Sequence, residues 1–192
     1  MPSEYSSKEK QKGRYLRELP QDYCVIDIET TGLCHIKNEI IELSALKIQN
    51  NKIIDKYSSL VKPNTEIKSF ITNLTGITNE MVSKERTIDF VIKEFCEFIG
   101  NMVVVGHNIS FDLRFIDANC KKHLTHSFAN DYCDTLKIAR KSIPNLKSYK
   151  LAILAEHFGI STEGHHRGLA DCEITFALIK EMLSIHQKEF AC

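Results

Sequence analysis

The sequence predicts an α/β fold in which one mixed sheet carries helices on both faces. Three apolar, β-branched runs follow one another in the first third of the chain, and they predict a meander of strands. Helical patterns then alternate with two shorter apolar runs, which gives a strand and helix order typical of a layered domain. The length of 192 residues, with 43% hydrophobic and 26% charged residues, fits one globular domain.

The expected strands each have a local signal. The first covers 23–28, and the second and third are joined by the turn 49–52, whose two asparagines tolerate positive φ and indicate a hairpin. The fourth is a short continuous apolar run of the kind that is buried on both faces of a sheet. The last four strands are expected at 40–48, 53–61, 102–105 and 131–134.

The expected helices follow apolar residues at helical spacing. A helix over 88–99 has Thr87 before it as N-cap and Gly100 as its stop. We expect residues 62–86 to be irregular, with one short helix after the turn at Thr75–Gly76. The remaining helices are expected from about 109 to 121, and over 136–143, 151–158 and 169–186.

The ends of the chain differ from its centre. Residues 1–19 are rich in Ser, Lys and Glu, and we expect a flexible polar leader there, disordered or loosely docked, followed by a folded domain over 20–187 and a short tail over 188–192. No apolar run approaches the roughly 20 residues that span a bilayer, and no signal peptide is visible. Seven cysteines without a C-x-x-C pair indicate reduced thiols. These features predict a cytoplasmic protein without a membrane partner.

Two carboxylates, Asp27 and Glu29, stand at the end of the first strand, directly before the turn Thr30-Thr31-Gly32. Residues i and i+2 of a strand point to the same face, so these side chains lie together. Their charges repel each other unless a cation lies between them. A hard divalent metal ion, which prefers carboxylate oxygen, is the simplest such cation.

Two further acids occupy telling positions. Asp112 follows the buried strand 102–105 in the first turn of a helix, where α/β proteins gather their sites. Asp171 continues the apolar stripe of the last helix, and a carboxylate there is costly to bury unless it is paired or binds metal. For Asp112 taken alone, an ordinary aspartate at a helix start is the simpler explanation, and for Asp171 taken alone a role as N-cap or in the first turn is an equally simple one.

His166 precedes Asp171 by five residues, in a loop. An imidazole has an ordinary pKa of about 6.5, which suits general-base catalysis near neutral pH. The chemistry of the side chain alone does not separate His166 from its neighbour His165, and a solvated loop histidine is the simpler reading of either one.

Taken together, three segments resemble the three motifs of the DEDDh 3′–5′ exonucleases. They are Asp27-x-Glu29-Thr-Thr-Gly, His107-Asn108-x-x-Phe111-Asp112 and His166-x-x-x-x-Asp171. The resemblance spans about residues 20–186 and is strongest to the proofreading exonucleases of bacterial DNA polymerase III, both the separate epsilon-type subunit and the exonuclease domain embedded in the Gram-positive replicative polymerase.

The resemblance implies a ribonuclease-H-like fold, with a five-stranded mixed sheet whose second strand is antiparallel to the rest. It implies that the four acids bind two Mg²⁺ or Mn²⁺ ions and that His166, selected over His165 by its spacing to Asp171, takes the proton from the attacking water. It also implies substrate contacts. These are the backbone amides of Thr30 and Thr31, an apolar wedge of Leu33 and Ile77, and Asn108.

The expected substrate is the single-stranded or frayed 3′ end of DNA, with nucleoside monophosphates as products and a replicative DNA polymerase as a candidate partner. Trimming of RNA by the same chemistry, or a non-catalytic nucleic-acid-binding subunit, are the alternatives. The formal net charge of zero argues against nucleic acid, but two divalent ions would raise it to about +4. The segment 137–150, with five basic residues and no acid, is a candidate track for phosphates.

Overall fold

The computed structural model describes residues 13–189, with side chains described through residue 185. Residues 1–12 of the expected leader and 190–192 of the expected tail lie outside this part of the chain. Within it, no helix has the length and apolarity needed to cross a membrane. The strands are β1 (Tyr23–Thr30), β2 (Ile40–Gln49), β3 (Lys52–Leu60), β4 (Val103–Gly106) and β5 (Tyr132–Asp134).

These strands form one five-stranded sheet in the order β3-β2-β1-β4-β5. Strand β2 is antiparallel to both β1 and β3, whereas β1, β4 and β5 pair in parallel. The second strand therefore runs opposite to the other four, which confirms the ribonuclease-H-like sheet that the motifs implied. The β2–β3 hairpin turns at Asn50 and Asn51, which both have positive φ.

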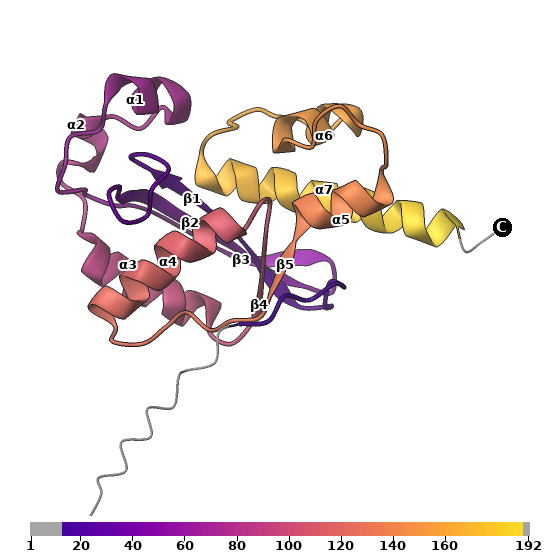
Figure 1. Cartoon of the computed structure of the whole chain (residues 1–192), viewed down its shortest axis with the longest axis horizontal. Coiled ribbons are helices and arrows are strands. Elements are labelled where there is room, and N and C mark those ends of the chain that lie inside the picture. The colour runs from indigo at the N-terminus through magenta and orange to yellow at the C-terminus, as the bar shows by residue number, and fades with distance from the viewer. Residues whose placement is uncertain (1–12, 190–192) are drawn as a thin grey trace, which may run out of the picture.

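Helices cover both faces of the sheet, as predicted (Figure 1). The long helix α7 (Gly168–Glu189) packs on one face together with α5 (Thr135–Ser142) and α6 (Leu151–His157). The other face carries α3 (Ile88–Ile99) and α4 (Ser110–His123). Two short helices, α1 (Ser69–Thr75) and α2 (Asn79–Val82), lie beyond the sheet and enclose a small separate core.

The alternation of β1 assigns its side chains to the two layers. Cys24, Ile26 and Ile28 join the core under α3 and α4, whereas Tyr23 and Val25 pack into the core under α7. Asp27 and Glu29 continue the second of these two series, so they point to the α7 face of the sheet. The strand pleat thus sends the apolar residues and the two acids in opposite directions at the same strand end, as predicted.

Two segments add detail to the expectation. Residues 13–19, the described part of the expected leader, are docked along the edge strand β5, where Arg14 forms an ion pair with Asp131 at 2.7 Å and Tyr15 bridges Tyr132. In the segment expected to be irregular, α1 is an additional helix that the sequence did not reveal. It ends at Gly76, whose φ of 72° is left-handed, so the turn at Thr75–Gly76 separates two helices.

Candidate active site

The carboxylates converge where the end of β1 meets the start of α7. Asp27 and Glu29 are partly buried on β1, and Asp171 is buried in the first turn of α7, at 6% exposure. Each of the three offers an oxygen atom, and these atoms all lie within 4.8 Å of one another. Three acids from two elements thus form one compact cluster, although 144 positions separate the first from the last.

Asp112 reaches the same place from the opposite side of the sheet. It is buried in the first turn of α4, and its Oδ1 accepts the backbone N–H of Ile28 at 3.2 Å. After burial, the charge of Asp112 is the largest cause that raises the pKa of Asp27, so the two carboxylates lie close enough to interact. The structure therefore brings all four predicted acids to the end of β1, with three of them within 4.8 Å of one another and Asp112 bound to the backbone of Ile28, between Asp27 and Glu29.

The electrostatics of the cluster are unfavourable without a cation. Burial, followed by the charges of Asp112, Glu29, Asp171 and Glu42, holds the pKa of Asp27 well above its ordinary value. Burial is also the main reason why the pKa of Glu29 rises to about 8 and that of Asp112 to about 7. A set of oxygen donors in which like charges are packed together fits a hard divalent metal ion.

Both histidines of the loop approach Asp171. His165 Nδ1 lies 2.5 Å from Asp171 Oδ1, and the backbone N–H of His166 donates to Asp171 Oδ2 at 3.4 Å. The two rings are stacked with centroids 3.8 Å apart, and His166 has a left-handed backbone with φ of 70°. Burial and the neighbouring His165 lower the pKa of His166. In this arrangement His165, not His166, makes the side-chain contact with Asp171.

The expected substrate contacts fall into two groups. Leu33 is 85% exposed, which excludes core packing as its role, and Asn108 is exposed beside the cleft described below. Ile77 is fully buried in the core between α1 and α2, so it cannot form the wedge as expected. The backbone amide of Thr31 already donates to Glu39 O at 2.9 Å, so it is not free to hold a 3′-hydroxyl. Thr30 is also buried, and its hydroxyl donates to Gly32 O at 2.8 Å.

A cleft of about 830 Å³ opens beside the histidines. His165 and His166 line one side of it, and Asn108 lies in its wall. The basic side chains that line the cleft are Arg140, Lys147 and Lys150. Three of the five basic residues of the segment 137–150 therefore border a space next to the carboxylate cluster.

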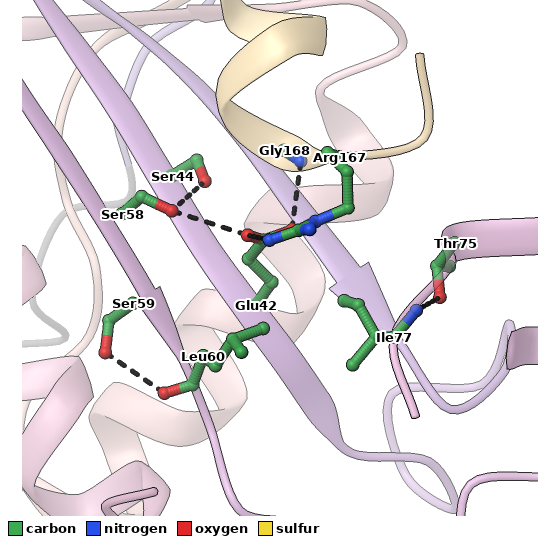
Figure 2. A network of polar contacts seen from close by, with 9 residues as sticks. All are labelled: Glu42, Ser44, Ser58, Ser59, Leu60, Thr75, Ile77, Arg167 and Gly168. Atoms are coloured by element: carbon green, nitrogen blue, oxygen red, sulfur yellow. Dashed lines mark hydrogen bonds and ion pairs between the residues drawn. The ribbon is translucent and has the colours of Figure 1, made fainter. Parts of the chain in front are cut away.

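A fifth carboxylate, Glu42 on β2, was missed by the sequence reasoning. It is 1% exposed, and it binds Arg167 and the backbone of Gly168 directly before and at the start of α7 (Figure 2). A signal for it exists in the sequence, because Glu42 interrupts an apolar run of residues that are expected to be buried. A buried glutamate needs a partner, and Arg167 beside His166 is a candidate.

The chain matches the family model described as RNase_T, Exonuclease, over residues 24–179. Among proteins of known name, it is 42% identical over 161 residues to the DNA polymerase III subunit epsilon of Aquifex aeolicus, covering 84% of this chain and 80% of that protein. It is also 41% identical over 172 residues to the DNA polymerase III PolC-type of Clostridium perfringens. That match covers 86% of this chain but only 12% of the much longer PolC-type protein.

Among solved structures, exonuclease X in complex with 5′-overhanging duplex DNA superposes on this chain with a TM-score of 0.70. The two sequences are 28% identical, and the superposition covers 84% of this chain and 91% of the other. The match to the family model, over residues 24–179, runs from β1 to the first turns of α7 and so includes the elements that contribute to the carboxylate cluster.

Proposed function

Because this chain belongs to the RNase_T exonuclease family, we propose that it is a metal-dependent 3′–5′ exonuclease acting on single-stranded or frayed ends of DNA. The observation that carries the proposal is the cluster of Asp27, Glu29 and Asp171, whose oxygen atoms lie within 4.8 Å of one another. Like charges gathered in a partly buried place weaken the fold unless a cation compensates them.

In the proposed reaction, water attacks the last phosphodiester, the bond from phosphorus to the 3′ oxygen breaks, and a nucleoside 5′-monophosphate leaves. The positive charge needed at the attacking and leaving oxygens would come from two bound Mg²⁺ or Mn²⁺ ions. The residues that we assign to holding them are Asp27, Glu29, Asp112 and Asp171.

We assign the proton of the attacking water to His166. Its lowered pKa keeps the imidazole neutral at physiological pH, and a neutral imidazole is able to accept a proton. Asp171 holds His165 through a 2.5 Å contact and accepts the backbone N–H of His166, so it orients the loop that carries both rings.

The cleft beside the histidines would hold the strand that leads to the 3′ end. Arg140, Lys147 and Lys150 are exposed along it and suit contacts to phosphates. The exposed Leu33 suits stacking against a terminal base. The named relatives are components of DNA polymerase III, which supports a role in proofreading or repair beside a replicative polymerase.

The test is digestion of end-labelled single-stranded DNA and RNA of matched sequence. We expect the 5′-labelled DNA to shorten stepwise from its 3′ end in Mg²⁺ or Mn²⁺, with nucleoside monophosphates as products, and EDTA to stop the reaction. Asp27→Ala is the control, because it should remove metal binding and activity together. Turnover of the Asp27→Ala protein in Mg²⁺ would contradict the proposed site. Faster digestion of RNA than of DNA would show that RNA is the substrate.

A further inference from the structure

The register of the first two strands places Glu42 among the active-site acids. Glu29 lies directly opposite Glu42, and Asp27 lies directly opposite Ser44. Opposed residues of an antiparallel pair share a face of the sheet, and like charges in such positions destabilise the pair. Glu42 adds its charge to those that raise the pKa of Asp27 and Glu29. A buried glutamate in that position needs a reason beyond packing.

The oxygens of Glu42 are already occupied by protein donors (Figure 2). Arg167 Nη2 donates to Oε1 at 3.0 Å and Arg167 Nε to Oε2 at 3.3 Å, so the guanidinium binds the carboxylate through both oxygens. The backbone N–H of Gly168 donates to Oε2 at 3.0 Å, and the Ser58 hydroxyl donates to Oε1 at 3.4 Å. These contacts direct Glu42 toward the chain before α7 and away from the role of a metal ligand.

Gly168 shows how closely α7 approaches the sheet at this point. A Cβ at this position would lie 2.7 Å from Ser44 Oγ, 3.0 Å from Ser44 Cβ and 3.5 Å from Asp27 Oδ2. The helix therefore begins directly against β2, beside one of the acids. Asp171 follows three residues later, and His166 precedes Gly168 by two. Whatever fixes Arg167 and Gly168 thus also fixes the segment that joins His166 to Asp171.

We propose, resting on the function proposed above, that Glu42 is a positioning residue of the exonuclease reaction. Together with Arg167 it forms a clamp between β2 and the start of α7, and this clamp holds His166 and Asp171 at the carboxylates of β1. Its anionic charge is compensated by the guanidinium and the Gly168 amide, so the clamp places α7 without competing for the cations. Arg167 also offsets part of the charge of Glu29.

The first test compares Glu42→Gln, Arg167→Gln and the double variant with the wild type. We expect Glu42→Gln to lower kcat by about 10- to 100-fold, the range found when residues that orient ligands are replaced, while KM for DNA changes by less than about threefold. Because the two residues act as a unit, the double variant should be no slower than the slower single variant. Arg167→Lys, which keeps the charge but loses the fork, should recover only part of the rate.

Hydrogen exchange supplies a readout that does not depend on activity. In Glu42→Gln, the amides of residues 164–170 should exchange at least about tenfold faster, because the acceptor of the Gly168 N–H is weakened, while the amides of β1 and β4 keep their protection. If the wild type proved inactive on every nucleic acid, the function proposed above would fall, and the exchange experiment would still decide whether the clamp holds this segment.

Glu173→Gln is the matched control. Glu173 lies on α7 and pairs with Lys56 of β3 at 2.5 Å, so it also links the sheet to the helix, but on the exposed surface. This variant should retain wild-type kcat and exchange within about twofold.

The proposal is overturned if Glu42→Gln keeps both the rate and the exchange of the wild type. It is likewise overturned if Glu42→Gln slows the reaction without faster exchange at 164–170, or if exchange rises throughout the domain. It is also overturned if Arg167→Gln raises KM without changing kcat, since Arg167 would then act by binding DNA and not by binding Glu42.

Discussion

At the scale of single residues, the site is a compromise between folding and chemistry. Asp27, Glu29 and Asp171 gather their carboxylates in one place. Burial and the neighbouring acids hold the pKa values of Asp27 and Glu29 above their ordinary values. The metal site proposed above gives a reason for this grouping, because a divalent cation needs several oxygen ligands at once. Two consequences of this arrangement can be measured.

The first prediction concerns the pH dependence of the metal-free protein. The pKa of Glu29 is raised from its ordinary 4.5 to about 8, so between these values the folded state holds a proton that the unfolded state has lost. The free energy of unfolding therefore falls as pH rises through this window, and the stabilising contribution of the protonated group is lost above it. Asp112, with a pKa of about 7, acts in the same direction.

Thermal melting from about pH 5 to about pH 9 measures this effect. In EDTA, Tm should decrease as pH rises, and Mn²⁺ should raise Tm more at the alkaline end, where the carboxylates are ionised. Glu29→Gln is the control, since it should flatten the profile in EDTA and reduce the gain from Mn²⁺. A Tm in EDTA that increases across this range would contradict the assigned pKa shifts.

The second prediction separates the two histidines. His166→Gln should slow the reaction by about 10²–10⁴-fold, the usual contribution of a general base, while His165→Gln should cost far less. His165 contacts Asp171 directly in the structure, so its replacement tests whether that contact is structural. Single-turnover rates on labelled DNA measure both variants. The reverse order of effects would make His165 the base and would overrule the assignment by motif spacing.

At the scale of elements, local patterns predicted the strands well because their causes are local. The apolar runs and the asparagine turn located β1, β2 and β3 within about two residues. The contact from Glu42 to Arg167 was not predictable in this way, because 125 positions separate them and the contact depends on strand register and helix approach together. The docking of Arg14 on Asp131 likewise joins residues 117 positions apart.

The third prediction belongs to the junction of β2 and α7. Gly168→Ala would insert a methyl group at 2.7 Å from Ser44 Oγ, so the start of α7 must move away from the strand. We expect a loss of about 1–3 kcal/mol in the free energy of unfolding, which lowers Tm by roughly 2–4 °C per kcal/mol. The rate of DNA digestion should fall even at temperatures at which the variant is fully folded, because Asp171 moves with the helix.

Ser44→Ala serves as the second-site control for this change. It removes the closest contact of the new methyl group but leaves Ser44 Cβ at 3.0 Å. The double variant Gly168→Ala/Ser44→Ala should therefore regain part of the lost Tm and part of the lost rate. A Gly168→Ala protein with the rate and Tm of the wild type would show that the helix start tolerates displacement.

At the scale of the whole molecule, the net charge of zero conceals an uneven distribution. Acids gather at the end of β1 and the start of α7, and basic residues line the cleft beside them. Such an arrangement lets one surface attract phosphates and cations at adjacent places without a basic protein overall. The balance of charge therefore says little about nucleic-acid binding in this chain, whereas its placement says much.

The fourth prediction tests the cleft. The double variant Lys147→Glu/Lys150→Glu should raise KM for single-stranded DNA. A plot of log binding constant against log salt concentration should also become less steep, by a slope of about one or more. The metal-induced rise of Tm should be unchanged. Lys93→Glu, on α3 at the other face of the sheet, is the control and should leave KM as it is. Binding titrations at several salt concentrations measure the slopes, and equal slopes for all variants would place the DNA elsewhere.

The pairing of Glu42 with Arg167 also bears on how the chain finds its fold. Both faces of strand β2 are mostly buried and each carries apolar residues, so hydrophobicity alone hardly distinguishes them. If β2 paired with β1 one residue out of step, Glu42 would enter the core under α3 and α4, where it would lack the guanidinium. A buried charge without its partner is costly, and this cost penalises the misaligned sheet. We therefore expect Glu42, the residue proposed to place the segment 166–171, also to favour the correct strand alignment during folding.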